Sequence, residues 1–429
     1  MAINTSKSLR NMVMYQIFIR NFSEEGTFNA VKERLDEIKA LGTDIIWLMP
    51  IHPIGKAKRK GTLGSPYAIS DYRAVNPEFG TIKDFKELVD AIHALGMKCI
   101  IDVVYNHTSP DSVLSKMHPG WFYHKEDGSF GNRVGDWTDI IDLDYNNCDL
   151  WRYQIDTLKM WARMVDGFRC DVAPLIPLEF WMQARREVEE IRPGCIWLSE
   201  SVEPGFITYM RSQGIPALSD GEIYRAFDLC YDYDVYGEFR AYLCGDGTLK
   251  AYAEALNRQE YLYPDNYVKL RFLENHDQPR AAFLIPDELS LLNWTAFCFF
   301  QKGMPLIYAG QEYCAVHTPS LFEKDTMDFS EESAEPEIVR YIKALSEIKR
   351  DPLFTDSIYR VEAQDEKYLI ATHEKNGRKA LGVFNLKGEV GYVKVDFPDG
   401  IYTDLISGEP VEVFRGGLRS ICEPVIIVK

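Results

Sequence analysis

The segment KCIIDVVYNH (Lys98–His107) places a continuous apolar run directly before a group of polar residues. A short apolar run of this kind is typical of a strand buried on both faces, as in a parallel sheet. The preceding segment, Ile82–Leu95, has apolar residues at helical spacing and is followed by Gly96, which favours a helix with a glycine at its end. A helix followed by a buried strand is the repeating unit of an α/β fold.

The same alternation runs through most of the chain. Besides Lys98–Val104, strands are predicted at Val13–Ile19, Asp44–Leu48, Gly167–Cys170, Cys195–Ser199, Ala226–Leu229, Val268–Leu273 and Leu306–Tyr308. Further helices are predicted at Asn29–Ala40, Leu150–Met164, Leu178–Ile191, Leu249–Gln259, Leu289–Gln301 and Glu337–Arg350. Eight strand–helix units over roughly 350 residues favour a (β/α)₈ TIM barrel over a doubly wound sheet.

Two parts of the chain depart from this rhythm. Residues 108–147 are rich in Gly, Asp and aromatic residues and show no period, which is typical of a functional loop or a small subdomain. After Thr355, alternating runs are separated by turn clusters such as Lys375-Asn376-Gly377, which predicts antiparallel strands. We therefore expect a barrel at 1–107 and 148–354, an insert subdomain after the third strand at 108–147, and a C-terminal β-sandwich domain at 355–429.

Composition narrows the possible partners and compartment. The 429 residues include 65 acidic and 48 basic side chains, and the net charge of −17 excludes nucleic acid and anionic membrane surfaces as partners. The nine Cys are scattered without a CxxC pair, which predicts reduced thiols in a cytoplasmic protein. The first residues contain no apolar signal segment, and the apolar stretch Leu291–Phe300 is too short to span a bilayer. The oligomeric state is not predicted.

Ionisable residues follow four of the predicted strands. They are Asp102 and His107 at the third strand, Arg169 and Asp171 at the fourth, Glu200 at the fifth, and His276 and Asp277 at the seventh. Because the C-terminal ends of barrel strands meet at one rim, we expect these side chains to converge. A helix cap or a structural ion pair would explain any one of these residues alone. Such roles do not explain well why four separate strands carry ionisable residues at the same end of the barrel.

Carboxyl groups in unlike surroundings suit the cleavage of a glycosidic bond. One must carry a proton for the departing oxygen, and another must be ionised to meet the oxocarbenium-like carbon. Arg169 lies two residues before Asp171 on the same strand face, so we expect its charge to keep Asp171 ionised. Glu200 follows the apolar Trp197 and Leu198, which are expected to raise its pKa.

Four segments resemble, in order, the strand-end motifs of the α-amylase family of glycoside hydrolases. They are DVVYNH (Asp102–His107), GFRCDVA (Gly167–Ala173), LSE (Leu198–Glu200) and ENHD (Glu274–Asp277). The resemblance implies a nucleophile, a general acid/base and a third carboxylate that holds sugar hydroxyls, at Asp171, Glu200 and Asp277 respectively. It also implies residues that position the nucleophile and the sugar, at Arg169, His107 and His276, a stacking ring at Tyr67 and a structural carboxylate at Asp102.

The resemblance implies a retaining mechanism with a covalent glycosyl–aspartate intermediate. Such a mechanism predicts a spacing of about 5–5.5 Å between the carboxyl groups of Asp171 and Glu200. The expected substrate is an α-glucan oligosaccharide, cleaved mainly at α-1,4 bonds of maltodextrins. Two features, Val172 after the nucleophile and Gln278-Pro279-Arg280 after Asp277, resemble those of family members that act on short oligosaccharides and α-1,6 bonds. Trp121, Phe122 and Trp137 suit either sugar stacking or packing of the insert.

The resemblance leaves the exact activity open. The same intermediate serves an α-glucanotransferase, and the family also contains α-1,6- and sucrose-active members. Outside enzymes, amylase-like chains occur as non-catalytic binding or partner subunits. Many amylases hold a structural calcium, and Asn106 matches one of its ligands, but the Lys-His pair that often follows the nucleophile is replaced by Pro174-Leu175. We therefore expect no required cofactor and keep Asn106 as the candidate calcium ligand.

Overall fold

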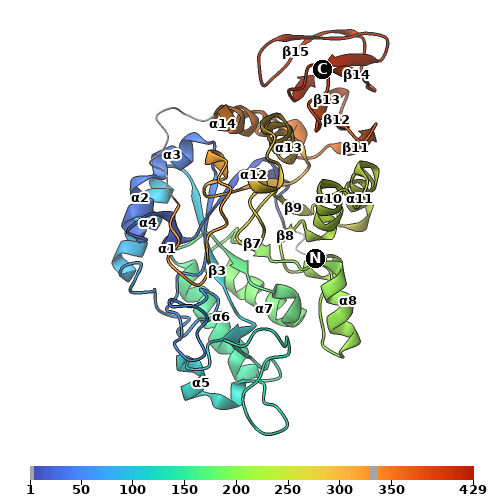
Figure 1. The fold of residues 1–429 in the computed structure, drawn as a ribbon. Coiled ribbons are helices and arrows are strands. Elements are labelled where there is room, and N and C mark those ends of the chain that lie inside the picture. The colour runs from blue at the N-terminus through green and yellow to red at the C-terminus, as the bar shows by residue number, and fades with distance from the viewer. Residues whose placement is uncertain (1–3, 328–336) are drawn as a thin grey trace.

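The computed structural model describes residues 4–327 and 337–429, so residues 328–336 of the expected barrel range lie outside it. Eight parallel strands close into a barrel in the order β1-β2-β3-β6-β7-β8-β9-β10 (Figure 1). Their bounds are Met14–Ile17, Ile45–Leu48, Lys98–Val103, Gly167–Cys170, Ile196–Ser199, Leu229–Tyr231, Val268–Arg271 and Met304–Tyr308. The predicted (β/α)₈ barrel is confirmed.

The strands are buried almost throughout, because helices cover the barrel on its outside. The helices are α1 Ile19–Phe22, α2 Phe28–Glu33, α3 Leu35–Ala40, α4 Ile82–Ala94, α5 Val113–Met117, α6 Cys148–Ala162, α7 Leu178–Glu189, α8 Pro204–Ser212, α9 Asp220–Ile223, α10 Tyr233–Cys244, α11 Leu249–Leu262, α12 Ala281–Leu284, α13 Glu288–Phe300 and α14 Glu337–Lys349. Helix α4 begins at a capping box formed by Thr81 and Asp84.

Two sequence-based expectations need correction. The helix predicted over Asn29–Ala40 is broken at Arg34, whose backbone (φ −106°, ψ 9°) leaves helical geometry and lets α2 and α3 each bury apolar residues. The sixth strand begins at Leu229, three residues later than predicted. Leu229 lies opposite Leu198 of β7, and Asp228 just before it bonds to Trp197 through both its backbone N–H and its carboxylate, each at 2.9 Å. Helices α8 and α10 were not predicted.

The insert between β3 and α6 contains α5 and a short antiparallel pair, β4 (His107–Thr108) with β5 (Ile141–Asp142). The C-terminal region holds a four-stranded sheet in the order β11-β12-β13-β18 and the two-stranded pairs β14–β17 and β15–β16. The bounds of these strands are Ile358–Gln364, Tyr368–Lys375, Arg378–Asn385, Gly391–Lys394, Gly400–Thr403, Pro410–Val413, Gly417–Ser420 and Val425–Val428 for β11 to β18 in turn.

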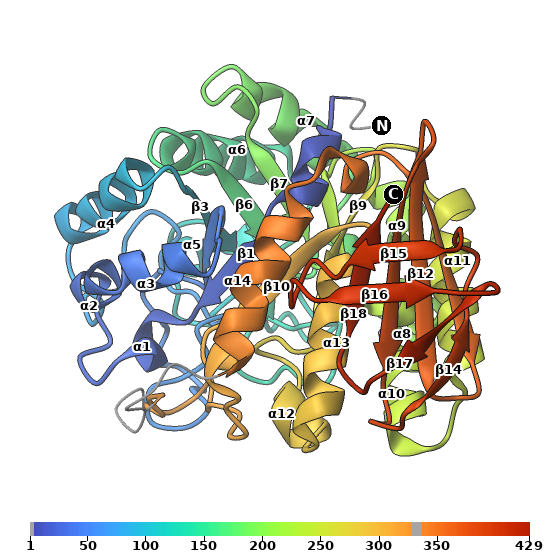
Figure 2. The ribbon, with the colours of Figure 1, turned by 90° about the horizontal axis from the view of Figure 1, so that it is seen from above.

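The C-terminal strands lie together at one side of the barrel, beside α11 and α13 (Figure 2). Side-chain amides fasten the sheet to these helices. Asn257 of α11 exchanges two hydrogen bonds with the backbone of Val361, and Asn293 of α13 accepts the N–H of Asn385 at 2.6 Å. Among the residues described, no helix is both long and apolar enough to cross a membrane.

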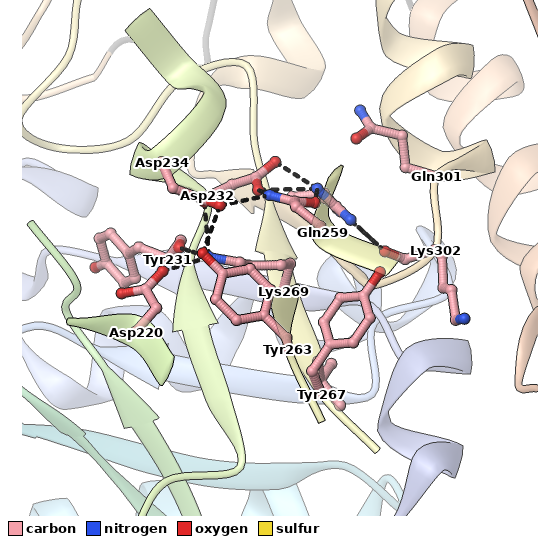
Figure 3. Close-up of polar contacts among 12 residues, drawn as sticks. Asp220, Tyr231, Asp232, Asp234, Gln259, Tyr263, Tyr267, Lys269, Gln301 and Lys302 are labelled. Atoms are coloured by element: carbon pink, nitrogen blue, oxygen red, sulfur yellow. Dashed lines mark hydrogen bonds and ion pairs between the residues drawn. The ribbon is translucent and has the colours of Figure 1, made fainter. Parts of the chain in front are cut away.

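A buried charged network lies outside the barrel lumen, where β8 and β9 meet the helices α9 to α11 (Figure 3). We call it the Lys269 network (Asp220, Asp232, Asp234, Gln259, Lys269 and Arg271). Lys269 Nζ contacts Asp220 Oδ2 at 2.5 Å and Asp234 Oδ1 at 2.7 Å, and Arg271 Nη1 lies 2.8 Å from both oxygens of Asp232. The Gln259 amide joins the two halves, because its Nε2 donates to Asp232 and Asp234.

Candidate active site

A single guanidinium gathers three carboxylates at the C-terminal rim of the barrel. Arg169 Nη1 lies 2.9 Å from Asp102 Oδ1 and 2.8 Å from Asp171 Oδ1, and its Nη2 lies 2.9 Å from Glu200 Oε1. The Arg169 side chain is fully buried, and its charge lies over the rings of Trp47, Tyr67 and Tyr231. These four residues, Asp102, Arg169, Asp171 and Glu200, form what we call the Arg169 cluster. Strands β3, β6 and β7 therefore bring together side chains that the sequence places up to 98 positions apart.

Burial dominates the ionisation of this cluster. It raises the pKa of Asp171 to about 7 and that of Glu200 to about 8, although the Arg169 guanidinium lowers both. The raised pKa of Glu200 was expected. The expected effect of Arg169 on Asp171 is wrong in its net outcome, because burial and the negative charge of Asp102 outweigh the guanidinium. Burial therefore favours the protonated form of both carboxyl groups.

Glu200 is also held by the backbone that follows β6. The N–H of Val172 donates to Glu200 Oε2 at 2.6 Å, so each oxygen of this carboxyl group has a fixed partner. Val172 achieves this in a left-handed conformation (φ 34°, ψ 42°). That conformation is unusual for a β-branched residue and persists where surrounding structure imposes it. The turn after Asp171 thus directs the backbone N–H of Val172 towards the Glu200 carboxyl group.

Tyr67 and His276 form one wall of the site. Their rings lie 5.5 Å apart at an interplanar angle of 18°, and the Tyr67 hydroxyl lies 2.7 Å from His276 Nε2. The amide nitrogen of Gln16 lies 2.7 Å from Nδ1, and Nε2 faces Asp277 Oδ2 at 3.0 Å. Burial lowers the pKa of His276 to about 4, so the ring is neutral at pH 7.

His107 lies on the opposite side of Asp171, where the insert begins. Its Nε2 is 3.9 Å from Asp171 Oδ2, and burial lowers its pKa to about 4. The ring of Trp137 packs against His107 at a centroid distance of 5.7 Å. Trp121 instead stacks on His118, and Phe122 is buried. Of Trp121, Phe122 and Trp137, only Trp137 lines the site.

These side chains surround a cavity of about 220 Å³. Its lining contains the predicted residues Tyr67, His107, Asp171, Glu200, His276 and Asp277. Arg169 and Asp102 lie behind this surface and act on it through Asp171 and Tyr67. Sequence reasoning missed Lys60, Ser65, Asp139 and Phe322, which also line the cavity. They lie in loops without a motif, so no local signal indicated them.

The residues around Asn106 do not fit a calcium ion. Asp142, beside it, has a buried Oδ1 without a hydrogen-bond partner, which by itself suits a metal. However, Asp142 Oδ2 accepts the backbone N–H of Arg133 at 2.7 Å, and the Arg133 guanidinium lies 3.6 Å from the same oxygen. Calcium needs six to eight oxygen ligands. Within the described part of the chain, no group of three or more acidic, His or Cys side chains is placed to hold a metal.

Comparison with known proteins agrees with this geometry. The pattern of one family, described as the alpha amylase catalytic domain, matches residues 16–118 and 110–356. The chain belongs to the α-amylase family. Its C-terminal residues 360–427 match a second pattern, the bacterial alpha amylase C-terminal domain, so both parts of this α-amylase family protein have counterparts in known proteins.

Individual relatives extend the likeness over the whole chain. An alpha-amylase from Lactobacillus plantarum is 48% identical, with a TM-score of 0.95 over 99% of this chain and 100% of that one. The noncanonic maltogenic alpha-amylase AmyB from Thermotoga neapolitana is 34% identical, with a TM-score of 0.88 over 98% and 99% of the two chains. Alpha-amylase MalA from Haloarcula japonica is 28% identical over 70% of this chain, which spans 44% of that relative's length.

Proposed function

We propose that the protein is a retaining glycoside hydrolase that cleaves α-1,4 bonds of maltodextrins. The observation that carries this proposal is that one buried guanidinium holds both Asp171 and Glu200 against a cavity lined by Tyr67, His276 and Asp277. The name of the Lactobacillus plantarum relative, an alpha-amylase, supports the reaction, and the maltogenic relative supports short products. A complete set of carboxylates around an open cavity argues against a purely binding role.

In the proposed mechanism Asp171 is the nucleophile. Its Oδ1 is held by Arg169, which leaves Oδ2 to attack the anomeric carbon and form the glycosyl–enzyme intermediate. Glu200 gives its proton to the departing oxygen and then, as a base, takes one from water. Burial raises the pKa of Glu200 and so favours the protonated acid that this step needs. This division of labour needs no metal ion among the reacting groups.

The remaining side chains hold the sugar. The Tyr67 ring offers an apolar face for stacking, and Asp277, whose side chain is 36% exposed, presents its carboxylate to sugar hydroxyls. His276 Nε2 faces the same region, while His107 Nε2 lies on the side of Asp171, and either neutral ring can exchange a hydrogen bond with a hydroxyl. Neutral donors of this kind suit an uncharged carbohydrate.

We further propose a cytoplasmic location and the division into barrel, insert (108–147) and C-terminal domain (355–429) drawn from the sequence. All nine Cys are free thiols, which suits a reducing compartment. A boundary near residue 355 agrees with the junction between the two family patterns, which fall on either side of residues 357–359.

The test is to follow maltoheptaose cleavage by ¹H NMR. The first-formed product should be the α-anomer, and a 5-fluoroglycosyl fluoride should label Asp171 in a peptide map. A β-anomer, or no cleavage, would contradict the proposal. Products longer than the substrate, formed from maltotriose in dilute aqueous buffer, would favour a glucanotransferase. Preference for isomaltose would identify an α-1,6-active enzyme, and preference for sucrose would identify a sucrose-active one.

A further inference from the structure

The cavity is also lined by Lys60, Ser65, Asp139 and Phe322, which have no role in the proposed mechanism. They come from three separate loops. Lys60 and Ser65 follow β2, Asp139 belongs to the insert after β3, and Phe322 follows β10. These loops are far apart in sequence, so contacts between them must hold their side chains at one cavity. The same contacts determine the shape of this side of the cavity and therefore which substrates fit there.

The loops after β2 and β10 are joined into one wall. The N–H of Leu63 donates to the carbonyl of Phe322 at 3.0 Å, and the N–H of Thr62 donates to Glu323 Oε1 at 2.9 Å. Arg20 of α1 fixes both loops from below, because its Nη1 donates to the carbonyls of Gly64 at 3.0 Å and Leu321 at 3.2 Å. We call residues 60–65 together with 320–323 the rim wall.

The strand order places the rim wall across the barrel mouth from Glu200. In the closed ring of eight strands, β1 lies opposite β7. The rim wall is built from the loops that follow β2 and β10, the two neighbours of β1, and is anchored on the helix that follows β1 itself. Glu200 directly follows β7. The cavity therefore has the acid/base on one side and the rim wall on the other.

This placement assigns the two sides of the cavity to the two parts of the substrate. A general acid must lie beside the oxygen that leaves, so the leaving part of the chain extends on the side of Glu200. The sugar that is attacked lies over Tyr67, and any further residues towards the non-reducing end would have to extend towards the rim wall. Tyr67 itself follows the rim wall by two residues.

An ion pair between Lys60 and Asp139 connects the rim wall to the insert. Lys60 Nζ lies 3.0 Å from Asp139 Oδ1, which ties the rim wall to the insert. The Asp139 side chain is only 6% exposed, whereas Lys60 is 37% exposed and bends over it. An ion pair that is shielded on one side holds its geometry better than a fully exposed pair, which contributes little. Phe322 adds an apolar ring to the same side of the lining.

We propose that the rim wall, locked to the insert by Lys60 and Asp139, bounds the non-reducing side of the cavity and makes the protein act on chain ends. The substrate class is thus the non-reducing end of a short α-glucan, and internal bonds of long chains are poor substrates. Lys60, Asp139 and Phe322 are specificity-determining residues. This inference rests on the proposed function and names the side from which that reaction starts.

The test compares two forms of 4-nitrophenyl α-maltoheptaoside, one free and one blocked by an ethylidene group on its non-reducing sugar. An enzyme that needs a free chain end should cleave the blocked form at least about tenfold more slowly. Equal rates on the two forms would overturn the inference and leave the proposed function standing. Failure to cleave either form would instead contradict the proposed function.

Variants assign the effect to the ion pair. The double variant Lys60→Ala/Asp139→Ala should raise the blocked-to-free rate ratio about tenfold, because the rim wall and the insert are then no longer joined by the ion pair and leave room for the blocked chain end. Lys60→Arg, which can keep the pair, should retain the wild-type ratio. Lys159→Ala removes a lysine that pairs with Glu187 between α6 and α7, away from the cavity, and should also leave the ratio unchanged. A wild-type ratio in the folded double variant would overturn the role of the pair.

Discussion

The Arg169 cluster and the Lys269 network are both buried and charged, but their charge balance differs. In the Arg169 cluster one cation serves three carboxylates beside an open cavity. In the Lys269 network two cations serve three carboxylates, and Gln259 and Tyr263 supply further donors. Burial raises the pKa of Asp220 and Asp232 in the network, yet contacts with Lys269 hold the pKa of Asp234 below its usual range.

The difference teaches how one barrel uses buried charge in two ways. In the Arg169 cluster one cation is shared by three carboxylates beside a cavity, and such groups are available for chemistry. In the Lys269 network two cations and further hydrogen-bond donors hold the carboxylates, and these contacts fix neighbouring elements to one another. Substitutions in the two regions should therefore have different consequences, which range from a loss of turnover to a small change in stability.

Asp171→Asn should lower kcat on maltoheptaose by at least about 10³-fold, because the amide cannot form the glycosyl intermediate. Maltotriose binding, measured by calorimetry, should persist. The pKa of Asp171 is raised to about 7 in the folded protein, so the ionised carboxylate destabilises the fold as pH rises through this range. The variant should therefore exceed the wild type in urea stability by more at pH 8 than at pH 5. Residual turnover near the wild-type rate would refute the nucleophile assignment.

Lys269→Met should cost about 3–5 kcal/mol of unfolding free energy, because it leaves Asp220 and Asp234 buried without their cation. Urea denaturation at pH 7 measures this. Adding Asp220→Asn should recover part of the loss, since it removes one of the uncompensated charges. Lys83→Met, at an exposed pair with Glu87, serves as the control and should change little. A loss below about 1 kcal/mol for Lys269→Met would show that the Lys269 network contributes little to the stability of the fold.

The pH dependence of kcat/KM should be bell-shaped, with Asp171 on the acid limb and Glu200, whose pKa is raised to about 8, on the alkaline limb. Asp102→Asn removes a negative charge that raises the pKa of Asp171. The acid limb should therefore move to lower pH, and the alkaline limb should move in the same direction, because Asp102 and Glu200 also interact. A profile measured from pH 4 to 10 decides this, and an unmoved acid limb would contradict the assignment.

The contrast also explains what could be predicted from the sequence. The Arg169 cluster is readable because each member directly follows an apolar strand or is its second-last residue, and parallel strands bring such positions to one rim. The Lys269 network is not readable in this way. Lys269 and Arg271 lie inside a segment whose alternate residues, Val268 and Leu270, predict a buried strand, and nothing local indicates that the polar face would also be buried.

Loops and registers depend on partners far away in the chain. The start of β8 follows two hydrogen bonds between Asp228 and Trp197, and the rim wall is set by contacts between the loops after β2 and β10. The ionisation of Asp171 was predicted with the wrong sign because sequence showed the neighbouring Arg169 but not the depth of burial. The sequence therefore predicts features that depend on local pattern, such as strands and the residues at their ends. It does not predict features that depend on contacts between distant segments, such as loop positions and burial.

The smallest expected effect concerns the insert, where a protein cation lies in the region in which many relatives hold calcium. Arg133 contacts Asp142 through its backbone and its guanidinium, and it also lies over the Tyr123 ring at 4.5 Å. Chelation with EDTA should therefore leave the melting temperature unchanged. Arg133→Ala should lower stability by about 0.5–1 kcal/mol, since the guanidinium is partly exposed and its pairing is screened.

Arg378→Ala, at the more exposed pair with Asp351, is the matched control and should have a smaller effect. If EDTA lowered the melting temperature by several degrees and added calcium restored it, a metal would have to displace the Arg133 guanidinium from Asp142. The insert would then be held by a metal ion, whereas the Lys269 network is held by protein cations. The thermal midpoint with and without EDTA thus decides whether this third region of buried charge resembles the Lys269 network.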